Sequence, residues 1–145
     1  MKNNIKFSCA IDTTDNSAGL GMEIWLDQQQ IFNQDCISGP QSFSYSFSDN
    51  EAEHELQFVM KHKKAEHTKI DTDGKILKDA CLIVTDLAFD DIDIGQPVAN
   101  NAIYTHDFNG TSNTVHNKFY GEMGCNGVVS LQFTTPFYIW LLENL

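Results

Sequence analysis

The sequence predicts an all-β chain that folds as a single-domain, two-sheet antiparallel β-sandwich of jelly-roll type over residues 1–145. Three observations predict this class. Around ten short segments alternate apolar and polar residues with a period of two, as strands with one buried face do. Clusters of Asp, Asn, Ser, Gly and Pro separate these segments, as expected of turns. The length of 145 residues and the hydrophobic content of 41% fit one domain with a substantial core.

The clearest alternation lies in residues 21–27, which we expect to form a strand. One side of that strand carries Met22, Ile24 and Leu26, and the other side carries Glu23, Trp25 and Asp27. Gln28 and Gln29 are the expected turn, and residues 30–36 are the expected returning strand. Because alternation sends Trp25 to the polar side, the sequence predicts a tryptophan that is partly exposed.

The other strands follow from the same pattern. In the first half of the chain we expect them at residues 5–11, 42–48 and 55–61, and a small hairpin at 68–77 that turns at Asp73-Gly74. In the second half we expect them at residues 81–89, 92–94, 102–108, 118–123 and 127–135. Residues 42–48 alternate most regularly, with Phe43, Tyr45 and Phe47 on one face and serines on the other. Such a strand has one wet side and one packed side.

The C-terminal residues 136–143 allow two interpretations. Thr135 as N-cap and Pro136 as the first helical residue would begin a helix. Aromatic and β-branched residues favour a strand instead, as does the position at the end of an all-β chain. We therefore expect a closing strand here, and no helix elsewhere in the chain, because no other segment has a helical period.

The charge of the chain excludes several classes of partner. The formal net charge is −11, and every basic side chain is Lys, because the chain has no Arg. Nucleic acids and anionic membranes reward a basic surface, so we expect neither as a partner. No segment approaches the roughly 18 apolar residues of a membrane span. The N-terminal residues also lack the apolar run of a signal peptide, so we expect synthesis in the cytoplasm without one.

The residues that most often bind metals or form disulfides show no strong motif. Cys9, Cys36, Cys81 and Cys125 are scattered, so we expect them to be buried, reduced and inert. The three histidines in residues 54–67 lack zinc spacing.

Two acidic stretches keep calcium open as a cofactor, although we expect none. Asp71-x-Asp73-Gly74 begins like a calcium loop, but the later ligands of such a loop are missing, and a hairpin turn explains the residues better. Asp90, Asp91 and Asp93 are explained in the same way, as a solvated turn.

No catalytic motif is present. The chain has no GxSxG, no phosphate-binding loop and no GxGxxG, so hydrolase and nucleotide chemistry have no sequence support. A short chain with short loops also disfavours a glycosidase site. We therefore expect that the protein is not an enzyme.

Surface aromatics with polar neighbours are the best candidates for a ligand site. They lie around the flexible residues 110–114 and on the Trp25 strand: Trp25, Tyr104, His106, Asp107, Asn109, His116 and Tyr120. Flat aromatic faces pack against sugar C–H groups, while amide and carboxylate groups bind the hydroxyls. The alternative is that the aromatics belong to the core and that the polar residues only decorate a loop.

Two resemblances extend this prediction. The Glu23-Ile24-Trp25-Leu26-Asp27 hairpin and residues 83–94 resemble jelly-roll carbohydrate-binding modules of the calcium-dependent, xylan-binding type. That family implies non-catalytic binding of glycans through loop aromatics and carboxylates, often around calcium. Residues 67–71 and 133–143 are similar to small β-sandwich proteins of marine tailed phages.

Two functions follow from these resemblances. The first is a module that binds a glycan or another polymer. The second is a virion-associated structural or interaction protein that contacts other virion proteins or itself. We prefer the first. Oligomeric state distinguishes the two, because an assembly protein should self-associate.

Overall fold

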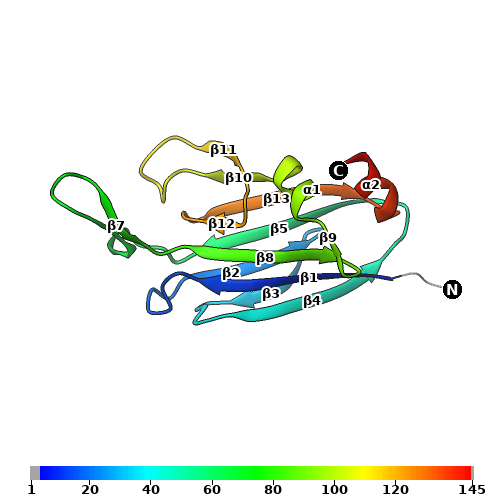
Figure 1. Ribbon diagram of the computed structural model, residues 1–145, viewed down its shortest axis with the longest axis horizontal. Coiled ribbons are helices and arrows are strands. Elements are labelled where there is room, and N and C mark those ends of the chain that lie inside the picture. Colours follow the sequence, from blue (N-terminus) through cyan, green and yellow to red (C-terminus); the bar gives the residue numbers. More distant parts are fainter. Residues whose placement is uncertain (1–3, 145) are drawn as a thin grey trace.

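Two antiparallel sheets face each other in the computed structural model, which describes residues 4–144 (Figure 1). The five-stranded sheet has the order β12 (Glu122–Met123), β8 (Leu82–Phe89), β1 (Asn4–Thr13) and β4 (Gln41–Ser48), with β9 (Ile92–Asp93) paired to β8. The six-stranded sheet has the order β11 (Val115–Lys118), β10 (Ile103–His106), β13 (Gly127–Thr134), β5 (Glu53–Lys61), β2 (Gly21–Leu26) and β3 (Gln29–Gln34). The predicted two-sheet sandwich is confirmed.

The core lies between the two sheets and follows the alternation of the sequence. Along β1, Ile5, Phe7, Cys9 and Ile11 are at most 4% exposed, while the residues between them point outward. Phenylalanine rings from both sheets meet at the centre, for example Phe89 and Phe133 with ring centroids 5.0 Å apart. Each such buried side chain contributes about 1.5–3 kcal/mol through removal of apolar surface from water.

A separate two-stranded ribbon extends from one end of the sandwich (Figure 1). It consists of β6 (Thr68–Ile70), which follows the short 3-10 helix η1 (Ala65–His67), and β7 (Ile76–Asp79). Its turn contains Gly74 with a φ of 82°, a conformation that glycine adopts without strain. The hairpin predicted for residues 68–77 is confirmed.

The hairpin of Trp25 turns one residue earlier than expected. Asp27 and Gln28 have φ angles of 51° and 69°, which are typical of the central pair of a type I′ turn. The expected pair of Gln28 and Gln29 is therefore wrong, and Gln29 already belongs to β3. Asp tolerates the left-handed region better than most residues, and both Asp27 carboxylate oxygens accept hydrogen bonds here.

The expected C-terminal strand is wrong, because Phe137–Glu143 forms the helix α2. Phe137 and Trp140 are 1% and 5% exposed, and both pack against Phe89. These two residues are three positions apart, so only a helix turns both onto the same side. The free energy of closing the end of the core thus outweighs the local β-propensity of the segment.

A second helix was not expected at all. The helix α1 (Gly95–Asn101) is rich in Gly, Pro and Asn, so it lacks both helical propensity and a clear apolar period. Buried Pro97 and Val98 attach it to the core. Within residues 4–144, no helix is long and apolar enough to cross a membrane.

The strand expected over residues 118–123 is divided between the two sheets. Its first part ends β11 in the six-stranded sheet, and its last part forms β12 beside β8. Phe119 is 1% exposed between them, and Gly121 has a φ of 99°. The continuous alternation of the sequence hides this crossing.

The cysteines agree with the sequence only in part. Cys9 and Cys81 are buried and free, as expected, and burial raises the pKa of both thiols to about 12. Cys36 is free but exposed and Cys125 is free but only half-buried, so the expectation of burial is wrong for these two residues.

Candidate functional site

Tyr104 and His106 lie on the inner side of β10 rather than on the surface. They are 7% and 8% exposed, and their ring centroids are 4.6 Å apart. The Tyr104 hydroxyl donates to the Cys125 carbonyl and accepts from the Cys125 N–H at 2.9 Å. Burial raises the pKa of Tyr104 well above its usual range. Both rings therefore help to pack the core, as the alternative interpretation of this region supposed.

Asp107 and Asn109 hold the loop between β10 and β11 in shape. Asp107 Oδ1 accepts the N–H of Gly110 at 2.8 Å, and Asn109 Oδ1 accepts the N–H of Asn126 at 2.8 Å. Such side-chain bonds to the backbone are typical of turns. The side-chain oxygens that these bonds use are thus engaged within the protein.

His116 and Tyr120 are exposed but belong to different parts of the surface. His116 lies on the outer side of the six-stranded sheet, with Nδ1 3.0 Å from Thr105 Oγ1. Tyr120 is 77% exposed and borders a hollow beside β8 and α1. The six residues expected between 104 and 120 therefore do not share one surface, and their role in binding stays a prediction.

The outer side of the six-stranded sheet gathers polar side chains around the seventh predicted residue, Trp25. Trp25 lies opposite Gln57 of β5, and Gln57 lies opposite Ser130 of β13. Strand alternation adds residues of the same face above and below this row. We call the whole group the Trp25 face: Glu23, Trp25, Gln28, Gln30, Glu55, Gln57, Ser130 and Gln132.

Glu23 anchors one side of the Trp25 face. Its Oε1 accepts the indole N–H of Trp25 at 2.8 Å and the amide of Gln30 at 3.0 Å, and its Oε2 lies 3.1 Å from Lys61 Nζ. Partial burial acts to raise the pKa of Glu23, but the hydrogen bonds from Trp25, Lys61 and Gln30 outweigh it, so the pKa lies below its ordinary value. Glu23 is therefore ionised and fixes the orientation of the indole ring.

Glu55 anchors the other side in a similar way. Its Oε2 accepts the Ser130 hydroxyl at 2.8 Å and the Gln132 amide at 3.0 Å, while its Oε1 accepts the Gln28 amide at 3.1 Å. These donors come from one strand, β13, and from the turn after β2. Among residues 4–144, the amide oxygens of Gln28 and Gln132 accept no hydrogen bond, so they can accept one from another molecule.

A polar hollow of about 510 Å³ continues the Trp25 face at the end of the sheet. Its lining includes Gln28, Glu55 and Gln132 of that face, together with Asp27, Asn50, Ala52, Glu53 and His54. His54 is 7% exposed and stacks on Phe133, with ring centroids 5.2 Å apart. The hollow is thus polar at its rim and has an imidazole in its wall.

His54 connects three loops at this end of the sandwich. Its Nδ1 is 2.6 Å from Asp27 Oδ2, and its Nε2 is 3.1 Å from Asn50 Oδ1 and 3.2 Å from Thr135 Oγ1. The series of hydroxyl, imidazole and carboxylate is similar in kind to a nucleophilic triad. However, Thr135 is 6% exposed, and its hydroxyl accepts the N–H of Ala52 at 3.0 Å. The three groups therefore act as a structural clamp.

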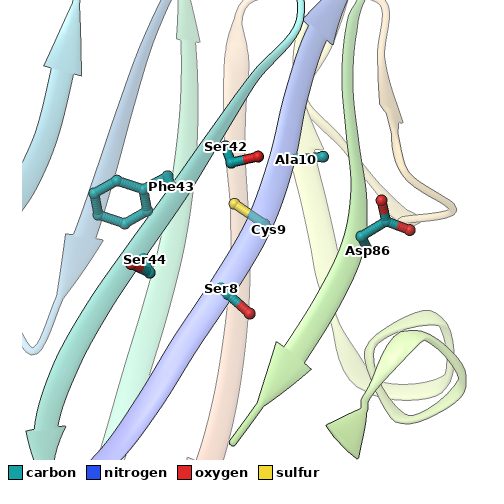
Figure 2. Close-up of a pocket in the computed structure, with 7 residues that line it drawn as sticks. All are labelled: Ser8, Cys9, Ala10, Ser42, Phe43, Ser44 and Asp86. Atoms are coloured by element: carbon teal, nitrogen blue, oxygen red, sulfur yellow. The ribbon is translucent and has the colours of Figure 1, made fainter. Parts of the chain in front are cut away.

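The outer side of the five-stranded sheet is very different. It has a hollow of about 270 Å³ that is lined mainly by small residues, with Ser8, Ala10, Ser42 and Ser44 among them. Figure 2 labels the residues of this lining. Asp86 stands at its border in a bulge of β8, where the pairing with β1 shifts by one residue. Its φ of 53° is unusual for a residue other than glycine. Asp86 also borders the hollow beside Tyr120.

Three of the acidic residues that could have suggested a calcium site, Asp71, Asp90 and Asp93, accept hydrogen bonds from backbone N–H groups. Asp71 Oδ1 accepts the N–H groups of Asp73 and Lys75, as the hairpin interpretation requires. Asp90 accepts the N–H of Lys6, and Asp93 accepts the N–H of Gly95. Over residues 4–144, no three His, Cys, Asp or Glu side chains lie close enough together to hold a metal ion. The side-chain oxygens of Asp71, Asp90 and Asp93 that make these bonds are thus used in turns.

Sequence analysis selected Trp25 as a candidate but not the residues that surround it. The alternation of residues 55–57 and 130–132 carried the signal, since it places Glu55, Gln57, Ser130 and Gln132 on the outer side. What it did not contain was the strand order, which makes β2, β5 and β13 neighbours.

Comparison with known proteins gives two similar solved structures. No family model and no curated protein matches the chain. One structure is the selenomethionine form of vCBM60, from work on two families of calcium-dependent carbohydrate-binding modules related by circular permutation. It is 11% identical, with a TM-score of 0.49 over 88% of this chain and 89% of that chain. The other is vCBM60 in complex with galactobiose, 10% identical, with a TM-score of 0.44 over 87% of this chain and 96% of that chain.

Both of those proteins are carbohydrate-binding modules. The similarity to phage sandwich proteins is not addressed by them and stays a prediction.

Proposed function

We propose that this chain is a non-catalytic module that binds a neutral glycan, and that the Trp25 face is its binding surface. The observation that carries the proposal is the position of Trp25, a partly exposed indole ring on a sheet face that also holds two anchored carboxylates and a row of amides. This combination suits sugars, which present both an apolar C–H surface and a rim of hydroxyls.

Each part of the Trp25 face has a role toward a sugar. The indole packs against C–H groups and is held by its hydrogen bond to Glu23. Glu23 Oε2 and Glu55 Oε1 each accept one contact within the protein, so each has a lone pair left to accept a hydrogen bond from a sugar hydroxyl. Charge-assisted hydrogen bonds of this kind are stronger than neutral ones. Within residues 4–144 the Gln57 side chain makes no hydrogen bond, so its amide is free to bind a hydroxyl beside the ring.

The shape and charge of the face indicate the class of glycan. The row from Gln30 through Trp25 and Gln57 to Ser130 crosses four strands without an enclosed pocket. Such a row fits an extended chain of several sugars better than a single small molecule. Because the face carries two carboxylates and the whole chain has a net charge of −11, uronic-acid and sulfated glycans are disfavoured.

A binding role also agrees with the chemistry at the end of the face. The only hydroxyl near His54 in the described part of the chain belongs to Thr135, which is buried and already bonded to Ala52. That hydroxyl is therefore not available as a nucleophile. Because Asp71, Asp90 and Asp93 accept backbone N–H groups, we expect binding to be unchanged by a chelator.

Binding isotherms with soluble neutral polysaccharides test the proposal, with polygalacturonate as the anionic comparison. We expect the wild-type chain to bind a neutral glycan and Trp25→Ala to weaken that binding by about 10- to 100-fold, as expected for loss of a central aromatic contact. Tyr120→Ala is the matched control, because it removes an exposed aromatic that lies away from the Trp25 face. Thermal unfolding of each variant confirms that it is folded.

Three results would contradict the proposal. The first is the absence of binding to any neutral glycan. The second is an equal loss of binding in Trp25→Ala and Tyr120→Ala. The third is binding that survives Trp25→Ala but is lost in Tyr120→Ala, which would move the site to the hollow beside α1. Binding that requires calcium would contradict the expected metal independence.

A further inference from the structure

The strand β4 has one side that is not paired. It is the last strand of the five-stranded sheet and pairs only with β1, over all eight residues and without a register shift (Figure 1). In an antiparallel strand, about half of the backbone N–H and C=O groups point to each side. Among residues 4–144, no other segment makes a hydrogen bond to the open side of β4. This side is therefore an exposed template for another strand.

The other sheet edges carry features that prevent pairing, and β4 does not. The strand β3 is interrupted by a register shift in its pairing with β2. The strand β11 has only four residues and ends at Lys118, and β12 has only two residues, with Glu122 as one of them. Short length, charge and bulges are the usual protections of an edge. The strand β4 is long, regular and uncharged, and it contains no proline.

Residues 42–48 of β4 have the same sequence in both directions. Residues 42–48 read Ser-Phe-Ser-Tyr-Ser-Phe-Ser, which is symmetric about Tyr45. If two copies pair antiparallel with a two-fold axis at Tyr45, Ser44 lies opposite Ser46 of the second copy, and Phe43 lies opposite Phe47. A two-fold interface uses the same patch on both copies, so such a patch must be complementary to itself. The symmetry of β4 provides this complementarity.

Partly exposed aromatic rings lie along the same edge. Phe43, Tyr45 and Phe47 pack against the core but are only half-buried. Phe32 of β3 lies beside them, with its ring centroid 5.2 Å from that of Phe43. An added strand with the same aromatic row would cover the remaining apolar surface, which is a favourable change.

Charge does not oppose this pairing although the chain is acidic. No residue of β4 is ionisable apart from the phenol of Tyr45. The nearest carboxylate along the chain is Asp49, which lies opposite Gln41 of the second copy in the symmetric register. The two Asp49 residues are then at opposite ends of the interface. Buried Oδ1 of Asp49 has no hydrogen-bond partner in the described part of the chain.

We propose that two copies of this chain form a symmetric dimer in which their β4 strands pair antiparallel about Tyr45. The five-stranded sheets then join into one continuous sheet, while both Trp25 faces stay open on the other sheets. This assembly is independent of the glycan proposal, since it uses a different surface. It also brings two Trp25 faces into one particle, so binding to a polymer with repeated sites gains avidity.

Sedimentation of the full chain over a concentration series tests the dimer. We expect a species of twice the 16.3 kDa chain mass that dissociates on dilution. Both serines are exposed, and the double variant Ser44→Lys with Ser46→Lys places lysines of the two copies opposite each other in the dimer. Within one chain, position 46 also lies opposite Lys6 of β1, so the folded state of this variant is checked separately. We expect the double variant to raise the dimer dissociation constant by at least about 100-fold.

A matched control and a rescue make the result specific to β4. Thr72→Lys with Thr114→Lys adds the same charge at exposed loop positions and should leave the dimer unchanged. The variant Ser44→Glu with Ser46→Glu should also be monomeric, and an equal mixture of the lysine and glutamate variants should form the mixed dimer. Thermal unfolding establishes that each variant is folded.

Two outcomes would overturn the proposal. One is a chain that stays monomeric at every concentration, even if it binds a synthetic peptide of residues 41–48. The other is a dimer that persists in the Ser44→Lys, Ser46→Lys variant, which would place the interface elsewhere.

Discussion

The two outer faces of this sandwich are built on the same alternation but carry different side chains. The outer side of the six-stranded sheet holds the Trp25 face, with one indole, two anchored carboxylates and several amides. The outer side of the five-stranded sheet holds Ala10 and several serines along β1 and β4 (Figure 2). Both faces satisfy the same fold, because only the inward residues build the core. The outward residues are therefore free to differ, and that difference is where we expect function.

The largest effect should come from the clamp at the end of the Trp25 face. His54→Ala removes a buried ring from Phe133 and takes away the imidazole that Asn50 and Thr135 contact. We expect a loss of about 2–3 kcal/mol in the free energy of unfolding, measured with urea. The substitution Ser44→Ala on the other face should change it by less than about 0.5 kcal/mol. A loss that small for His54→Ala would show that the clamp is not structural.

The next effect concerns binding. Glu55→Ala removes the acceptor for Ser130, Gln132 and Gln28, which disorders the amides beside Trp25. We expect glycan affinity to fall about 10-fold, which corresponds to about 1.4 kcal/mol. Ser44→Ala should leave affinity unchanged, and titration calorimetry of both variants measures the difference. Equal glycan affinities in the two variants would contradict the proposal that the Trp25 face, and not the outer side of the five-stranded sheet, binds the glycan.

A smaller effect should follow from the backbone of Asp86 on the five-stranded sheet. Its φ of 53° is tolerable for Asp but strained for a β-branched residue. We expect Asp86→Val to lower the free energy of unfolding by about 1 kcal/mol. Asp86→Gly should keep it within about 0.5 kcal/mol, because relief of strain offsets the greater freedom of glycine in the unfolded chain. If both variants unfold alike, the bulge is not strained.

The smallest effect should be a difference in acid sensitivity. Burial acts to raise the pKa of Glu23, but hydrogen bonds from Trp25, Lys61 and Gln30 bring it below the ordinary value of 4.5. A carboxyl whose pKa is lower in the folded state stabilises the fold above its unfolded pKa, and this stabilisation is lost as pH falls through the folded pKa.

Glu23→Gln should therefore reduce the loss of stability below pH 4.5, by less than about 1 kcal/mol. Urea unfolding from about pH 6 to about pH 3 measures it, a range that spans the unfolded pKa. If Glu23→Gln and the wild type lose stability equally as the pH falls, the Glu23 carboxylate does not make the contacts with Trp25, Gln30 and Lys61.

The sequence by itself determined the fold class and most strands. Its period of two is a direct consequence of strand geometry, since alternate residues point to opposite faces. Residues 42–48 show this best, because every apolar residue there faces the core. The same alternation predicts that Trp25 lies on the outer side of its strand, and the half-buried indole among polar neighbours agrees with it.

Only the tertiary structure decided the features that depend on distant contacts. The helix α2 forms because the end of the core accepts Phe137 and Trp140, which local propensity does not reveal. Tyr104 and His106 are buried because β10 turns them inward, although their loop looked like a site. The Trp25 face exists because β2, β5 and β13 become neighbours. Strand order arises from long-range pairing, and the local pattern of a sequence does not specify it.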